Sequence, residues 1–349
     1  MKIVKAGIIG QGNIGSELLE RLPWENRVNW GIGFIANTKK IFTSVDGGSI
    51  VQGNIKHSQI LKNIPSALAE QCATVNIVFL AVSSRDDGKE EYELLKMITS
   101  LGKPVVTCAK GALSNFFSEL SSSSALPLIG YNAAVGGGTM ILKEAKSRLD
   151  SFVHGLIVIL NGTMNHFMDR VSEGKSYEEA IAEARRNKYV EPPKDGGKSL
   201  PEDILTGEAC RDAPMKTAVF CNHVLGIPLW AREIEVPEIS FDGVRFLVNN
   251  AANFRHFVTF ERLENRSLGY GEDPIIGAFN KEVDGWRIKG GFRRLNPMLR
   301  AHLLVPDVTN VLIADEGSYG YNIIARGLGA GPGPTVTTMI RDGYRLLNM

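Results

Sequence analysis

The sequence has little cysteine and no excess of charge of either sign. Only four of its 349 residues are cysteines, and none of them form a CxxC pair. Lys and Arg together number 39 against 38 for Asp and Glu, which leaves a formal net charge of +1. The scarce, scattered cysteines argue against a disulfide framework or a structural zinc site. The balanced charge gives no indication of a nucleic-acid partner.

Long hydrophobic runs are also absent. A run such as Leu156–Leu160 is far shorter than the roughly 20 apolar residues that span a bilayer. The start, MKIVKAGIIG, has a brief apolar stretch that leads straight into a glycine loop, so it predicts a buried strand rather than a signal peptide. The six histidines form no HExxH motif. We therefore expect a cytoplasmic protein with no membrane partner and, from its length, two domains.

The first motif is a glycine loop between a strand and a helix. Val4–Ile9 is a short apolar segment, GQGNIG follows it, and apolar residues then recur at helical spacing up to Pro23. Such a loop allows a tight turn, a close approach to a pyrophosphate and close packing of helix on strand. The predicted cofactor contacts are Gly10, Gly12, Asn13, Ile14 and Gly15.

Strand and helix patterns continue to alternate after this loop. Val28–Ala36, Val75–Val82 and Pro104–Cys108 are strand-like, and Glu90–Thr99 between the last two is helix-like. This alternation is typical of βαβ units. It predicts an α/β fold with a Rossmann-type, doubly wound parallel sheet.

The end of the second predicted strand bears on the choice of cofactor. An acidic residue there would bind the ribose 2′-hydroxyl of NAD. The sequence instead continues Ala36-Asn37-Thr38-Lys39-Lys40, without a carboxylate. Lys39 and Lys40 could receive a 2′-phosphate, although a solvated loop would have the same composition. We predict NADP as the cofactor, with NAD as the alternative.

Four further segments resemble those of homoserine dehydrogenases, in the same order. They are VVTCAKG (Val105–Gly111), YNAAVGGG (Tyr131–Gly138), LNGTMN (Leu160–Asn165) and GAGPGPT (Gly329–Thr335). The resemblance implies reduction of L-aspartate 4-semialdehyde to L-homoserine by a nicotinamide cofactor. It also implies a homodimer that acts on a small amino-acid substrate.

The family resemblance implies a division of the chain into two domains. Residues 1–130 with 318–349 would bind the dinucleotide, and residues 131–317 would form an α+β dimerisation and catalytic domain. Several local patterns agree with such a layout. Phe152–Leu160 is strand-like, Ser176–Glu179 is a capping box, Asp284-Gly285 predicts a hairpin turn, and Val336–Leu347 predicts a closing helix.

Two lysines are candidates for stabilising the alkoxide that forms during reduction. Lys216 follows Asp212 by four residues, and the segment resembles the family's DxxxK, which implies that Lys216 is catalytic with Asp212 orienting it. Without the resemblance, an ordinary surface ion pair would explain the spacing. Pro214 predicts that this helix begins near Asp212. Lys110 is the second catalytic candidate and also a cofactor contact.

The resemblance supplies further site residues. Ser83 and Ser84 resemble family residues beside the nicotinamide, although serines often merely follow a strand. Glu191, in YVEP, is the implied anchor for the substrate ammonium, and Asp203, Thr163 and Gly162 are implied substrate contacts. The stretch Pro193–Leu200 is longer than usual in the family, and Glu208–Cys210 looks inserted before the Arg-Asp pair.

A monovalent-cation site is implied only weakly. Asn132, Val135, Gly137 and Thr139 occupy the family's cation loop, but Asn132 replaces the glutamate that usually carries the charge. We therefore expect weak cation binding or none.

Two alternatives stay open at this point. A dehydrogenase of the same fold could act on another small amino-acid aldehyde or hydroxy acid. The long Pro193–Leu200 stretch, Asn132 and Ala109 favour that alternative as departures from the family pattern. A non-catalytic dimer that senses NADP is the second. Its weakness is that a sensor needs none of Lys110, Glu191, Asp212 and Lys216.

Overall fold

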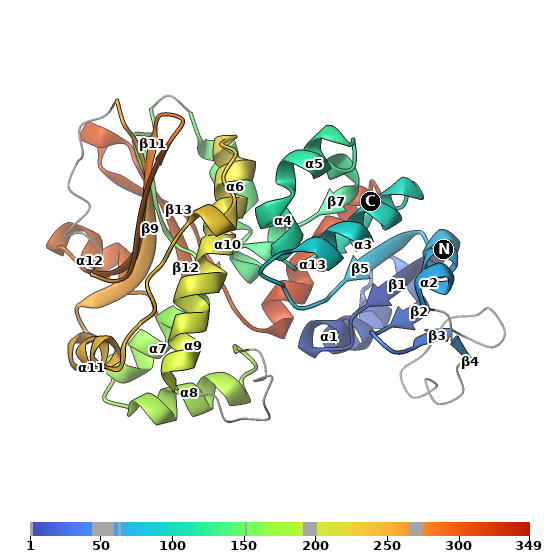
Figure 1. Ribbon diagram of the computed structural model, residues 1–349, viewed down its shortest axis with the longest axis horizontal. Coiled ribbons are helices and arrows are strands. Elements are labelled where there is room, and N and C mark those ends of the chain that lie inside the picture. The colour runs from blue at the N-terminus through green and yellow to red at the C-terminus, as the bar shows by residue number, and fades with distance from the viewer. Residues whose placement is uncertain (1–2, 44–58, 62–63, 151, 191–200, 265–274) are drawn as a thin grey trace. The chain divides into compact units, whose positions relative to one another are not determined.

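The computed structural model describes residues 3–43, 59–61, 64–150, 152–190, 201–264 and 275–349. The chain forms two compact units, Met1–Ala134 with Thr335–Met349, and Val135–Pro334 (Figure 1). Among the described residues, no helix has the length and apolar character needed to cross a membrane.

The first unit is built on a seven-stranded sheet with the order β4-β3-β2-β1-β5-β6-β7. Strands β2, β1, β5, β6 and β7 are parallel, and β3 pairs antiparallel both with β2 and with the edge strand β4. The strands are β1 (Ile3–Ile9), β2 (Asn29–Ala36), β3 (Ile41–Thr43), β4 (Gln59–Leu61), β5 (Ile77–Leu80), β6 (Val105–Thr107) and β7 (Ile129–Gly130).

Helices cover the parallel sheet, and the chain's last helix is one of them. The helices are α1 (Asn13–Arg21), α2 (Ile64–Thr74), α3 (Lys89–Ser100), α4 (Gly111–Asn115), α5 (Phe117–Ser122) and α13 (Pro332–Leu346). Leu18 of α1 and Met339 of α13 share a core cluster with Ile8 and Phe79 of the sheet. The alternate strand residues, such as Val78, are also fully buried. Both faces of the sheet are therefore covered, as a parallel sheet requires.

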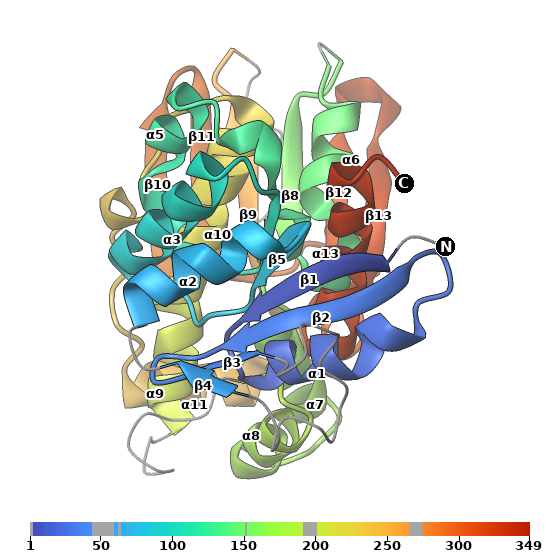
Figure 2. The same cartoon turned by 90° about the vertical axis from the view of Figure 1, so that its right-hand side faces the viewer.

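The second unit is built on a six-stranded antiparallel sheet with the order β10-β11-β9-β8-β12-β13 (Figure 2). The strands are β8 (Gly155–Ile159), β9 (Phe254–Arg262), β10 (Ile276–Val283), β11 (Trp286–Arg294), β12 (Thr309–Asp315) and β13 (Tyr321–Leu328). The helices are α6 (Ile141–Arg148), α7 (Gly162–Ser172), α8 (Tyr177–Arg186), α9 (Pro201–Gly207), α10 (Ala213–Phe220), α11 (Phe241–Asn250) and α12 (Pro297–Leu303).

Two apolar clusters hold this unit together. One joins α7, α8, α9 and α11 with Phe254 and Phe292 of the sheet. The other joins Phe257 of β9 with Leu299 and Leu303 of α12. Since Phe254 and Phe257 lie three residues apart on one strand, they face opposite sides, and the sheet is covered on both. The α/β fold class predicted from the sequence, a Rossmann-type sheet plus an α+β unit, is confirmed.

The structure places some boundaries elsewhere than the sequence does. The units divide after Ala134 and after Pro334. Strand β13 pairs with β12 in the second sheet, whereas the sequence-based boundary at 318 assigned it to the first domain. The strand expected over Phe152–Leu160 begins only at Gly155. The capping box at Ser176 is present at the start of α8.

The α-helix predicted to begin near Asp212 is α10, which starts at Ala213 with Asp212 as its N-cap and Pro214 in its first turn. The sequence did not indicate the helical turns that precede it. Helical structure is continuous through α9, a π-helical turn at Glu208–Asp212, and α10. In the wide turn the N–H of Ala213 donates to the carbonyl of Glu208, five residues back. This widening shifts the carbonyls that an interior proline would otherwise meet, so Pro214 is accommodated. The residues that looked inserted, Glu208–Cys210, lie in this turn.

Candidate active site

The glycine loop has the geometry that close approach of a ligand requires. Gly10 has φ +106°, and a Cβ there would lie 2.2 Å from the carbonyl oxygen of Ala81. A Cβ on Gly15 would lie 1.9 Å from the carbonyl oxygen of Gly10, so α1 packs directly on the loop. Gly12 is different, because a Cβ there would have nothing within 4 Å. It caps the N-terminus of α1 beside open space, which suits a pyrophosphate.

The turn between β2 and β3 carries the two lysines predicted to select NADP. The side-chain oxygen of Asn37 accepts hydrogen bonds from the backbone N–H groups of Lys39 and Lys40, both at 2.9 Å. The Asn37 amide donates to Gln11 in the glycine loop. Lys39 and Lys40 are exposed, and no carboxylate lies between Ala36 and Thr43. The turn is therefore a fixed, basic segment joined to the glycine loop.

Two predicted cofactor residues meet at the carboxyl ends of β5 and β6. The backbone N–H of Lys110 donates to the hydroxyl of Ser84 at 2.9 Å. Ser83, beside it, is exposed. The two loops are thus joined at the edge of a parallel sheet where ligands of such folds bind.

In the second unit, Lys216 and Asp212 form an ion pair of 2.6 Å. Their side chains are only 11% and 18% exposed, respectively. The pair joins the π-helical turn to α10, one turn apart. Such shielding makes this interaction stronger than an ordinary surface pair.

Asn161 fixes the pair to a second element. Its side-chain amide donates to Asp212 at 2.9 Å and to Glu208 at 2.6 Å. Its side-chain oxygen accepts the N–H of Met164 and so caps α7. The sequence did not assign a role to Asn161 or Glu208. Asn161 stood within a quoted motif, but nothing local indicates a contact with residues about fifty positions away.

The charges of Lys216 and Asp212 act on the pKa of buried His256, but this histidine cannot serve as an acid. Complete burial, together with the positive charges of Arg293 and Lys216, lowers the pKa of His256 to about 3. The imidazole is therefore neutral at physiological pH.

The predicted substrate residues Gly162 and Thr163 open α7, directly after Asn161. A Cβ on Gly162 would lie 2.6 Å from the carbonyl oxygen of Val308, so only glycine fits. The Thr163 hydroxyl donates to the carbonyl of Tyr189 at 3.0 Å. The start of α7 therefore contacts Tyr189 and the segment at Val308, and Asn161 joins it to the Lys216–Asp212 pair.

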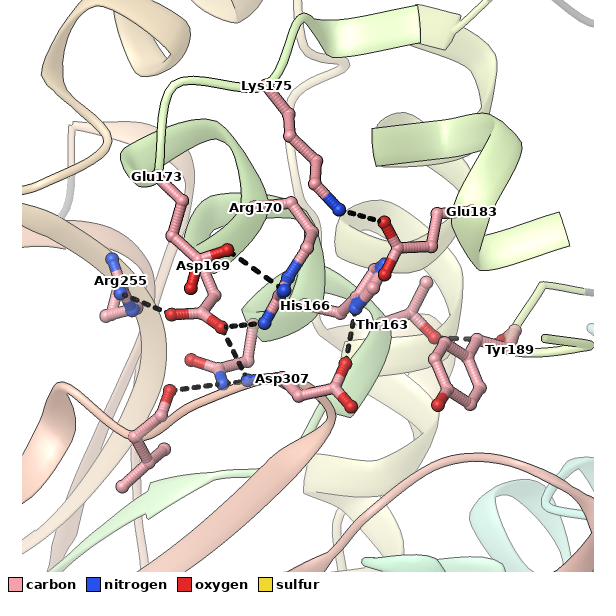
Figure 3. Close-up of polar contacts among 12 residues, drawn as sticks. Thr163, His166, Asp169, Arg170, Glu173, Lys175, Glu183, Tyr189, Arg255 and Asp307 are labelled. Carbon is pink, nitrogen blue, oxygen red and sulfur yellow. Dashed lines mark hydrogen bonds and ion pairs between the residues drawn. The ribbon is translucent and has the colours of Figure 1, made fainter. Parts of the chain in front are cut away.

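A polar network then ties α7 to the loop before β12 (Figure 3). The buried imidazole of His166 contacts the carboxylate of Asp307 at 2.5 Å. The N–H of Asp307 donates to Asp169, which also pairs with Arg170, each at 2.7 Å. The ring of Tyr189 lies edge-on to His166, 5.2 Å between centroids. The network thus fixes the loop whose Val308 carbonyl touches Gly162.

We expect Asp307→Ala to lower the free energy of unfolding in two ways. Loss of the carboxylate that contacts buried His166 should cost about 1–3 kcal/mol, and the change in backbone preference adds to this. Asp307 also has a left-handed backbone, with φ 53°, which alanine disfavours. Asp284, exposed in a hairpin turn with φ 45°, supplies the control, since Asp284→Ala incurs the backbone cost alone. Urea unfolding of both variants measures the difference. Equal losses would show that the His166 contact contributes nothing.

The remaining predicted site residues are Asp203, Glu191 and the four residues of the cation loop. Asp203 is exposed on α9. Glu191 and the stretch 193–200 lie outside the described residues. Asn132 donates to Asp342 at 2.7 Å within the first unit, whereas Val135, Gly137 and Thr139 belong to the second. Within the described ranges, no group of three or more His, Cys, Asp or Glu side chains could hold a metal ion. The carbonyl cation site stays a prediction.

The fold and these two groups of residues define a class of protein. A Rossmann-type sheet whose glycine loop leaves space above Gly12, and a shielded lysine–carboxylate pair, are the parts of a nicotinamide-dependent oxidoreductase.

Comparison with known proteins identifies the family. A family profile described as homoserine dehydrogenase matches residues 143–343, which is more than half of the chain. A homoserine dehydrogenase of Sulfurisphaera tokodaii is 26% identical over 73% of this chain and 71% of its own length. The chain belongs to the homoserine dehydrogenase family.

Solved structures show the same fold. The homoserine dehydrogenase of Thermoplasma acidophilum superposes with a TM-score of 0.70 at 19% identity, covering all of both chains. A hyperthermophilic archaeal homoserine dehydrogenase in complex with NADPH gives a TM-score of 0.67 at 21% identity, over 99% of this chain and 98% of its own.

Proposed function

We propose that this protein reduces L-aspartate 4-semialdehyde to L-homoserine with NADPH. The observation that carries the proposal is the shielded Lys216–Asp212 pair, held by Asn161 beside Gly162 and Thr163. Membership of the homoserine dehydrogenase family supplies the reaction.

The chemistry follows from where charge develops. Reduction places negative charge on the former aldehyde oxygen, and a nearby cation or proton donor stabilises it. Bound NADPH supplies the hydride. Lys216 donates a proton to that oxygen, and Asp212 orients its side chain through the 2.6 Å ion pair. In the reverse direction Lys216 accepts the hydroxyl proton.

The substrate's amino-acid end needs partners of its own. We propose that Glu191 and Asp203 pair with its ammonium group, and that Gly162 and Thr163 contact its backbone. Lys110, with Ser83 and Ser84, would contact the cofactor and the reacting carbonyl. The resemblance of Tyr189–Pro192 and Pro201–Gly207 to family motifs supports these roles for Glu191 and Asp203.

For the cofactor, we propose a preference for NADP over NAD. The support is the fixed, acid-free turn that presents Lys39 and Lys40. The solved relative in complex with NADPH agrees with this preference.

Replacing both Lys39 and Lys40 with alanine should raise KM for NADPH about tenfold or more and leave KM for NADH unchanged, because only NADPH carries the 2′-phosphate. Initial rates with each cofactor measure this. Lys146→Ala, which removes an exposed lysine of α6, is the control for lost positive charge. Unchanged KM for NADPH in the double variant would mean that the phosphate binds elsewhere.

Several broader features belong to the same proposal. We propose that the first unit binds the dinucleotide and that the second carries the substrate site and the dimer contacts of a homodimer. The four free cysteines suit the cytoplasm. Cation binding through Asn132, Val135, Gly137 and Thr139 would be weak.

A substrate panel tests the proposed function against its rivals. Purified protein would be given NADP with L-homoserine, L-serine, L-threonine and simple hydroxy acids, and formation of reduced cofactor followed by absorbance. We expect L-homoserine to give the highest kcat/KM. A clear preference for another compound would favour the same-fold alternative. NADPH binding without turnover of any compound would favour the sensor.

A further inference from the structure

A buried carboxylate lies next to the predicted cofactor residues, and the chemistry above does not use it. Glu91, in the first turn of α3, is only 2% exposed. Its neighbours Glu90 and Lys89 are exposed. Buried carboxylates are rare unless they are paired or hydrogen-bonded, so this one needs a structural or functional reason.

The contacts of Glu91 are to backbone N–H groups from two loops. One carboxylate oxygen accepts the N–H of Arg85, and the other accepts the N–H of Ala112, both at 2.7 Å. Arg85 lies in the loop after β5, two residues from Ser83. Ala112 lies at the start of α4, two residues from Lys110. Glu91 therefore joins the two loops that carry the predicted cofactor residues.

The loops fit together only because glycine stands where they touch. A Cβ on Gly111 would lie 2.3 Å from the carbonyl oxygen of Arg85 and 2.6 Å from the Glu91 carboxylate. A Cβ on Gly88, which has φ +62°, would lie 2.2 Å from the carbonyl carbon of Gly111. The Tyr92 and Phe116 rings stack beside this contact, 4.6 Å between centroids.

We propose that Glu91 is a positioning residue for hydride transfer, which fixes the backbone at Ser84 and Lys110 so that both present a constant geometry to the nicotinamide end of the cofactor. The proposal rests on the proposed function. The N–H of Lys110 that donates to Ser84 is the direct link between the Glu91 contacts and the site.

The charged form of the carboxylate suits this role. Each oxygen receives an N–H donor, so a protonated oxygen would place its own hydrogen against a donor. Burial raises the pKa of Glu91, while the hydrogen bonds from Arg85 and Ala112 and the charge of Lys110 oppose that rise.

The test compares Glu91→Gln with Glu93→Gln, an exposed glutamate of the same helix. Glu90 is unsuitable as a control because it pairs with the side chain of Arg85 at 2.6 Å. Hydrogen exchange of the Arg85 and Ala112 amides, followed by NMR, needs no cofactor or substrate. We expect exchange at least tenfold faster in Glu91→Gln and unchanged in Glu93→Gln, since glutamine offers one acceptor oxygen instead of two.

Kinetics then separates positioning from loss of folded protein. In Glu91→Gln, kcat should fall about tenfold or more, because small misplacement of reacting groups slows the chemical step. The primary isotope effect on kcat, with deuterium at the transferred position of NADPH, should increase. A smaller folded fraction would lower kcat without changing the isotope effect. Glu91→Asp, which keeps the charge but shortens the reach, should be intermediate, and it replaces Glu91→Gln if that variant does not fold.

Unchanged amide exchange and an unchanged isotope effect in the Glu91 variants would overturn the proposal, and so would equal effects in Glu93→Gln. Failure of the proposed function looks different, because the wild-type protein itself would then not turn over L-aspartate 4-semialdehyde. The exchange measurement still decides whether Glu91 holds the two loops.

Discussion

Lys216→Ala should lower kcat by about a hundredfold or more while the affinity for NADPH stays nearly unchanged. The lysine is expected to act on charge that exists chiefly in the transition state, so its loss slows the chemical step rather than cofactor binding. Asp212→Asn keeps the size and hydrogen bonding but removes the charge 2.6 Å from Lys216, and its loss should be smaller. Steady-state kinetics and NADPH titration measure the two effects.

A matched control exists within the same unit. Lys175 pairs with Glu183 at 2.5 Å, so Lys175→Ala removes another lysine–carboxylate ion pair of this unit. Circular dichroism and melting should show each variant folded. If Lys216→Ala kept near-normal turnover while Lys110→Ala were inactive, Lys110 would be the catalytic lysine instead.

Gly12→Ala should abolish tight NADPH binding without destabilising the protein. Gly12 has φ −75°, and its Cβ would meet nothing within 4 Å, so alanine fits the free protein. The added methyl group would occupy the space through which the pyrophosphate approaches the backbone. We expect the affinity for NADPH to fall about a hundredfold, as it would if several close contacts with the cofactor were lost. Calorimetric titration and thermal unfolding measure the two quantities.

Gly15→Ala provides the contrast. Its Cβ would lie 1.9 Å from the carbonyl oxygen of Gly10, so this change should lower stability by several kcal/mol, as overpacking does. Normal NADPH binding by Gly12→Ala would show that the cofactor does not approach this loop.

Local patterns predicted the parts of the fold that depend on neighbours in sequence. The strand, glycine loop and helix at the start of the chain follow from residue spacing, and the capping box at Ser176 follows from two residues three positions apart. The contact between Lys216 and Asp212 is likewise set by helical spacing. Such features need no knowledge of the rest of the chain.

Features that depend on distant contacts could not be predicted. The bridge from Asn161 to Glu208 joins separate elements, and Glu91 resembles its exposed neighbours Glu90 and Glu93 until the fold buries it. Pro214 indicated where α10 begins, but not that a π-helical turn leads into it. The rule for proline assumes α-helical hydrogen bonding, and the π-helical turn before it changes which carbonyl each N–H meets.

The central claim is that this protein is an NADPH-dependent reductase of L-aspartate 4-semialdehyde that depends on Lys216. The most direct measurement mixes wild-type and Lys216→Ala protein, each saturated with NADPH, with L-aspartate 4-semialdehyde, and follows loss of the reduced nicotinamide while mass spectrometry identifies the product. We predict stoichiometric formation of L-homoserine by the wild type, at least about a hundredfold faster than by the variant. Absence of L-homoserine with the wild type, or equal rates for both proteins, would contradict the account.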